Sequence, residues 1–170
     1  GVGACGCGWG WWAGRTATST RTRTPPPLYF GGTSPAARDV AARYADCYLM
    51  WVEGVEAIAA LAGDLRARAA AHGRTLAFGL RTHVIVRPTE AEARRAAAAL
   101  ISELDPEVGR RLKESAHDHR SEGVRRQDAL RAAADGDGFV EPSLWTGIGV
   151  ARSGVGAAIV GDPDQVEAKL

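Results

Sequence analysis

The sequence predicts an α/β fold in which strands alternate with helices. Short apolar runs over residues 28–30, 47–51 and 76–86 have the length and composition of buried strands. The segments after them show helical spacing of apolar residues or a recognisable capping residue. This alternation favours parallel pairing through βαβ units.

The first two strand–helix units are predicted from Pro25 onward. The strand over residues 28–30 ends in Gly31-Gly32. A hydroxyl cap with proline at the first helical position, Ser34-Pro35, predicts a helix through about residue 44. A second strand covers residues 47–51. The spacing over residues 55–71 predicts a second helix that stops at the following glycine.

The third predicted strand, residues 76–86, is the longest. Thr89 and Glu92 have capping-box spacing and predict an alanine-rich helix to about residue 104. The dipeptides Asp105-Pro106 and Asp162-Pro163 predict the starts of two more helices.

This third strand carries the strongest chemical signal. On a continuous strand, Arg81 and His83 project from the same face because side chains alternate. A purely structural parallel strand is apolar on both faces. The pair is either a satisfied buried polar pair or part of an anion or reactive-oxygen site.

Two glycine-containing segments give weaker signals. The turn Gly31–Ser34 lets the backbone approach a ligand and precedes a helix N-terminus, where N–H groups attract phosphate, although ordinary turns share these letters. Segment 147–156 has one central cation, Arg152, and is either a flexible connector or a mobile loop that brings charge over a site.

Composition excludes several function classes. The chain has 170 residues, the size of one domain, and 21 basic against 20 acidic residues give a net charge of +1. Neither a nucleic-acid partner nor an anionic membrane is indicated. No apolar span, secretory signal, disulfide scaffold or metal-ligand spacing is seen, and we expect a cytoplasmic protein without a metal site. Arg125-Arg126 is expected to be solvated, as is the cluster at residues 117–119.

Residues 1–24 differ from the rest of the chain. They contain no acidic residue, three of the five tryptophans, and neither helical nor strand periodicity. We expect a disordered or non-native leader followed by one domain over residues 25–170. The alternative is a basic arm or a Cys-x-Cys metal-ligand pair at Cys5 and Cys7, for which no nearby ligands are present.

Several segments together resemble a known family. The segments Pro26–Ser34, Tyr48–Trp51 and Phe78–Arg87 resemble the alkanesulfonate monooxygenases, a branch of the bacterial-luciferase-like flavin monooxygenases. So do Leu144–Gly149 and Ala158–Asp162. The resemblance runs from about Pro25 to Leu170. Its Arg-x-His and Leu-Trp-x-Gly-x-Gly motifs are the parts specific to the sulfonate branch.

The resemblance implies a TIM barrel with its site at the carboxyl ends of the strands. Family members take reduced FMN (FMNH2) from a separate NAD(P)H-dependent reductase. They use it with O2 to oxygenate the carbon that bears the sulfonate, which releases an aldehyde and sulfite for sulfur acquisition. A homo-oligomer is also implied.

The resemblance also assigns residues to this site. Arg81 and His83 would lie beside flavin and sulfonate, Trp51 would form a pocket wall, and Arg152 would close a mobile loop over the site. Gly32, Thr33 and Ser34 would hold the FMN phosphate, and the catalytic group would comprise Arg81, His83 and Arg152.

The chain also departs from the family pattern. A TIM barrel has eight strands and about 250 residues, and only three convincing strands, corresponding to the fifth to seventh, are predicted. We therefore expect a fragment that is inactive by itself. The alternatives are a related enzyme acting on a sulfone or another organosulfur compound, and an inactive truncated remnant.

Overall fold

The structure is a computed structural model, and it describes residues 25–116, 121–150 and 154–170. The predicted α/β class is confirmed. The elements in chain order are β1 (Tyr29–Gly31), α1 (Pro35–Tyr44), β2 (Cys47–Trp51), α2 (Val55–Ala70), β3 (Ala77–Arg81), β4 (His83–Val86), α3 (Glu90–Ile101), α4 (Pro106–Ser115), α5 (Glu122–Ala132), β5 (Phe139–Glu141), β6 (Leu144–Trp145), the 3₁₀ helix η1 (Gly147–Val150), β7 (Ala158–Gly161) and α6 (Pro163–Lys169).

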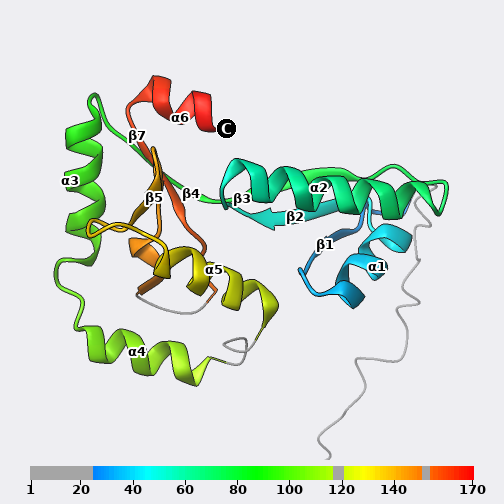
Figure 1. The fold of residues 1–170 in the computed structure, drawn as a ribbon, viewed down its shortest axis with the longest axis horizontal. Coiled ribbons are helices and arrows are strands. Elements are labelled where there is room, and N and C mark those ends of the chain that lie inside the picture. Colours follow the sequence, from blue (N-terminus) through cyan, green and yellow to red (C-terminus); the bar gives the residue numbers. More distant parts are fainter. Residues whose placement is uncertain (1–24, 117–120, 151–153) are drawn as a thin grey trace, which may run out of the picture.

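The strands form two separate sheets (Figure 1). The first has the order β1-β2-β3 and is parallel throughout. The second has the order β4-β7-β6-β5, in which only the β4–β7 pair is parallel. The prediction of one continuous strand over residues 76–86 is wrong, because the chain leaves the first sheet after Arg81 and enters the second at His83.

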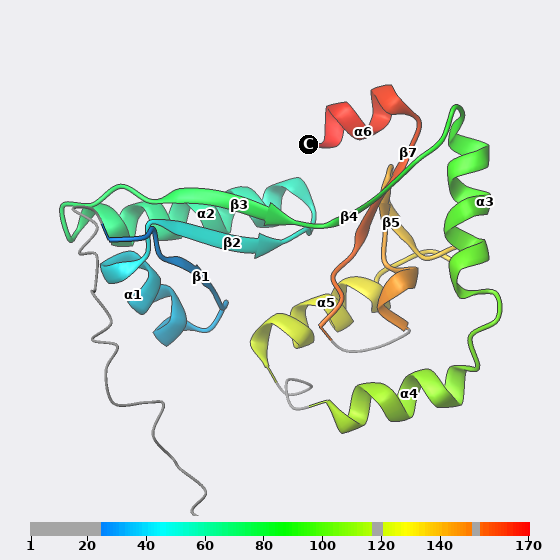
Figure 2. The ribbon, with the colours of Figure 1, turned by 180° about the vertical axis from the view of Figure 1, so that it is seen from behind.

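Each sheet has its own core. Helices α1 and α2 pack against one face of the first sheet, where Tyr48, Met50 and Leu65 are buried. Helix α3 packs against the second sheet around Ile85 and Trp145. The chain therefore passes from one packed half to the other between β3 and β4, as Figure 2 shows from behind.

The capping residues explain where most helices begin. Ser34 Oγ accepts from the N–H of Ala37 at 3.3 Å, and Asp162 forms a reciprocal capping box at the start of α6. Asp105 caps α4 as predicted. Thr89 caps α3, but this helix ends at Ile101, earlier than the predicted residue 104.

No helix in the described ranges is long and apolar enough to cross a membrane.

Candidate functional site

A cavity of about 440 Å³ lies at the carboxyl ends of the three strands of the first sheet. The last residues of these strands, Gly31, Trp51 and Arg81, all line it. The N-terminus of α5 closes the opposite side, where the end of α5 approaches β1 in Figures 1 and 2. Ligand sites in α/β folds favour this end of parallel strands. The lining residues are Gly31, Gly32, Thr33, Ser34, Leu49, Met50, Trp51, Glu53, Leu61, Arg81, Ser121, Glu122 and Gly123.

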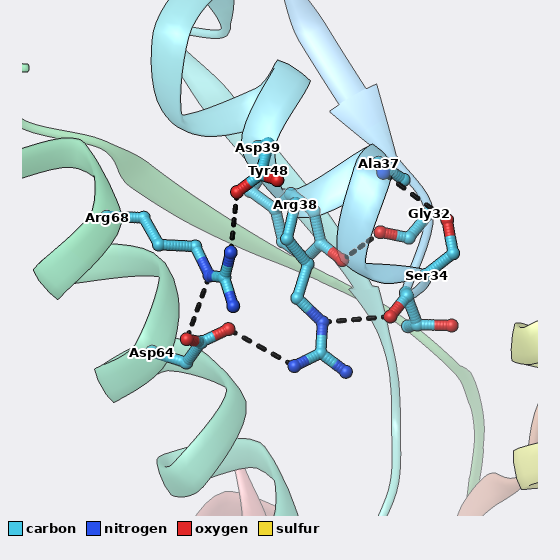
Figure 3. Close-up of polar contacts among 9 residues, drawn as sticks. Gly32, Ser34, Ala37, Arg38, Asp39, Tyr48, Asp64 and Arg68 are labelled. Atoms are coloured by element: carbon cyan, nitrogen blue, oxygen red, sulfur yellow. Dashed lines mark hydrogen bonds and ion pairs between the residues drawn. The ribbon is translucent and has the colours of Figure 1, made fainter.

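The turn between β1 and α1 has a fixed backbone. Gly32 has a φ of 144°, and a Cβ there would lie 2.9 Å from the Cβ of Ala37, so glycine is required by both strain and space. Tyr48 Oη donates to the carbonyl of Gly32 at 2.5 Å, and Arg38 Nε donates to the carbonyl of Thr33 at 2.8 Å (Figure 3). Burial raises the pKa of the Tyr48 phenol, so this hydroxyl remains a donor at neutral pH.

Two polar groups at the cavity lack protein partners among the described residues. The hydroxyl Oγ1 of Thr33 is buried and forms no hydrogen bond with any residue that the structure describes. Arg81 is exposed and forms no ion pair with any described carboxylate. A buried donor beside a helix N-terminus and an unpaired guanidinium suit an anion such as phosphate or sulfonate. The residues present therefore fit the phosphate group of FMN.

The α5 side of the cavity is shaped by a small residue and an ion pair. A Cβ at Gly123 would lie 3.3 Å from the Trp51 ring and 3.8 Å from Thr33 Oγ1. Because glycine has no side chain, the space beside the Trp51 ring and the Thr33 hydroxyl stays open. Arg126 donates to both carboxylate oxygens of Glu53, at 3.0 and 2.5 Å. The prediction of a solvated Arg126 is therefore wrong, and the charge of Glu53 is neutralised at the cavity edge.

Five of the seven predicted site residues line this one cavity: Gly32, Thr33, Ser34, Trp51 and Arg81. His83 does not line it. It is exposed at the first position of β4, paired with Ala158 in the second sheet. Arg152 lies outside the described residues, as does the cluster at 117–119. Within the described residues, no group of three or more acidic, histidine or cysteine side chains is arranged to hold a metal ion.

Sequence reasoning missed the α5 contribution and the residues behind the turn. Ser121 caps α5 by accepting from the N–H of Val124 at 3.2 Å, and a Ser-Glu-Gly sequence is a recognisable helix start. Nothing in its spacing indicates that this start faces Thr33. Tyr48 reads as an ordinary core residue, and Arg38 reads as a solvated helix cation.

Two curated relatives cover the same part of the chain. A protein named sulfoquinovose monooxygenase from Novosphingobium aromaticivorans is 57% identical over 145 residues, which are 85% of this chain and 40% of that protein. A protein of the same name from Agrobacterium fabrum is 52% identical over 145 residues, which are 85% of this chain and 38% of that protein. The chain thus spans about 40% of the length of the curated relatives it matches.

Solved structures share the fold at low sequence identity. DmoA from Hyphomicrobium sulfonivorans matches with a TM-score of 0.62 and 18% identity over 85% of this chain and 34% of that one. A riboflavin lyase matches with a TM-score of 0.57 and 18% identity over 84% of this chain and 34% of that one. The family model for luciferase-like monooxygenases matches residues 11–170. Together with these structures it shows that the described fold is part of a luciferase-like TIM-barrel fold. The chain belongs to the luciferase-like monooxygenase family.

Proposed function

We propose that the full-length protein is an FMNH2-dependent monooxygenase that releases sulfite from an organosulfonate. Family membership supports a monooxygenase. The observation that carries the proposal is the unpartnered Thr33 hydroxyl and the unpaired Arg81 in one cavity. The proposed reaction breaks the carbon–sulfur bond. One atom of O2 enters the aldehyde, the other enters water, and FMNH2 supplies two electrons.

The residues of the turn would hold the cofactor through its phosphate. Gly32 permits close approach of the backbone, Thr33 offers its free hydroxyl, and Ser34 begins a helix whose first N–H groups have no helical acceptors. Bound reduced FMN would supply the activation of O2. We expect a separate NAD(P)H-dependent reductase to provide it and a homo-oligomer to form, both on the resemblance.

Other residues would bind and enclose the substrate. Arg81 would pair with the sulfonate, which is a permanent anion, and Trp51 would form an apolar wall that excludes water. Arg152 would close over the site, and His83 would act beside it. These two assignments rest on the resemblance alone.

The favoured substrate class is a sulfonated sugar. Two curated relatives, 57% and 52% identical, are named sulfoquinovose monooxygenases, and this favours sulfoquinovose over a simple alkanesulfonate. An alkanesulfonate is the second candidate, because Leu49 and Trp51 give the cavity an apolar side that suits an alkyl chain.

The test measures sulfite release from sulfoquinovose and octanesulfonate, and formaldehyde release from dimethyl sulfone. It uses the full-length protein with an FMN reductase, NADH and O2. We expect the highest kcat/KM for sulfoquinovose. Arg81→Met is expected to lower kcat/KM at least tenfold, whereas Arg66→Met, the same change on the outer helix α2, leaves it unchanged. Highest kcat/KM for octanesulfonate or the sulfone contradicts the substrate class, and no sulfite from any substrate contradicts the function. The isolated 170-residue chain is expected to release none.

A further inference from the structure

The turn Gly32–Ser34 is held through its carbonyl groups. Tyr48 donates to the carbonyl of Gly32 at 2.5 Å, and Arg38 donates to that of Thr33 at 2.8 Å. A trans peptide is planar, so its N–H points opposite to its C=O. Fixing these two carbonyls therefore also fixes the N–H groups of Thr33 and Ser34, directing them away from Tyr48 and Arg38.

Those two N–H groups are available to a ligand. Within the described part of the chain, neither donates to any backbone carbonyl or side chain. Both belong to residues that line the cavity, next to the unpartnered Thr33 hydroxyl. An anion bound there would thus meet three donors from two consecutive residues.

Arg38 is itself held from behind, as Figure 3 shows. Its Nη1 donates to Asp64 Oδ2 at 3.1 Å, while Asp64 Oδ1 accepts from Arg68 Nε at 2.8 Å. Arg68 also reaches Asp39 on α1 at 2.5 Å. The guanidinium of Arg38 is thus oriented by α2 and its charge is balanced by Asp64, so it acts on the turn through geometry rather than as a free cation.

We propose that Tyr48 and Arg38 are positioning residues for the phosphate of the flavin. They orient the peptide groups of the turn so that the N–H groups of Thr33 and Ser34 face the phosphate, and neither side chain contacts it. This inference rests on the proposed function, because it takes the cavity as the FMN site.

The phosphate contribution is measured by comparing FMN with riboflavin, which lacks only the phosphate. Dissociation constants for both flavins are determined by fluorescence titration of the full-length protein. We expect the wild type to prefer FMN. We expect Tyr48→Phe and Arg38→Met each to lower that preference about tenfold, since misdirected donors lose charge-assisted hydrogen bonds. Riboflavin affinity should stay within about twofold, because a general loss of structure would weaken both flavins alike.

Matched controls make the same chemical changes away from the turn. Tyr44→Phe alters an exposed tyrosine on α1, and Arg66→Met alters an arginine on α2 that lies over the Phe78 ring. Both are expected to keep the wild-type preference. A wild type that prefers FMN, with Tyr48→Phe and Arg38→Met variants that prefer it equally, overturns the inference and leaves the proposed function intact. A wild type that binds neither flavin, or both equally, overturns the inference together with the cofactor site.

Discussion

Gln127 on α5 joins the two sheets, and its replacement tests how strongly. The side chain is only 6% exposed. Its Nε2 donates to the carbonyl of Val52, after β2, at 3.2 Å, and its Oε1 accepts from the N–H of Ala157, before β7, at 3.1 Å. Val52 and Ala157 are each 2% exposed, so water does not readily replace either bond. Gln127 therefore satisfies two buried backbone groups from different sheets.

Gln127→Leu preserves the approximate size but leaves both groups unpaired. Each unsatisfied buried group costs about 1–3 kcal/mol, partly offset by about 1 kcal/mol from the more apolar side chain. We therefore expect the free energy of unfolding to fall by about 1–5 kcal/mol.

Urea unfolding, followed by tryptophan fluorescence and far-UV circular dichroism, measures this loss. Arg125→Leu, at an exposed position on the same helix, is the control and should change stability by less than about 0.5 kcal/mol. Gln127→Glu supplies a second test, because the protonated acid both donates and accepts as the amide does. Its stability should approach that of the wild type at low pH and fall as the carboxyl ionises. A Gln127→Leu loss no larger than the Arg125→Leu loss would refute the reasoning.

Three further predictions concern the turn and its support. Partial burial of Asp64 favours the neutral acid, but hydrogen bonds from Arg68 and Arg38 outweigh this effect and hold the pKa of Asp64 below the ordinary 3.8. The ionised carboxylate therefore stabilises the fold above pH 3.8, and this stabilisation is lost as the pH falls further. Acid unfolding curves of wild type and Asp64→Asn should therefore converge at low pH, and a constant difference would contradict this. Burial raises the pKa of Tyr48 above 10.0, so the unfolded state loses its proton first and stability should fall above pH 10, less steeply in Tyr48→Phe. If the free energy of unfolding, measured by urea titration, fell equally steeply with pH above pH 10 in the wild type and in Tyr48→Phe, this reasoning would be contradicted. Gly32→Ala should cost about 1–3 kcal/mol in unfolding free energy, because φ is 144° and a Cβ would crowd α1. An unchanged urea midpoint would show that the turn relaxes freely.

Local signals in the sequence were sufficient to predict the α/β class and where several helices begin. The Ser34 and Asp162 caps act within a few residues, so a single sequence shows where α1 and α6 begin. The strands of the first sheet place Phe30, Tyr48, Met50 and Phe78 in the core with α1 and α2, and apolar runs of this kind are visible in the sequence. The turn at Gly32 is predictable because a positive φ at this site demands glycine.

The second sheet was not predictable by the same reasoning. Alternation of side chains continues through Arg81, Thr82 and His83, so periodicity gives no sign that the chain changes sheets there. Strand β6 has two residues, too short for any period to be recognised. Pairing of β7 with β4 brings together residues about 75 apart, and such a contact is set by tertiary packing rather than local preference.

The site depends on this unpredictable part as much as on the predictable turn. Trp51 ends β2, and the next two residues, Val52 and Glu53, are held by Gln127 and Arg126 of α5. These two adjacent contacts hold the N-terminus of α5 over the open side of the cavity, opposite the turn. Because both anchors lie next to the Trp51 wall, a shift of α5 must also change the space between that wall and the turn. The shape of the cavity therefore depends on the same α5 contacts that help to join the two sheets. The apolar cluster of Val52, Leu144, Ala157, Ile159 and Val166 also joins them. The anion-binding groups, by contrast, belong to the first sheet and its turn alone.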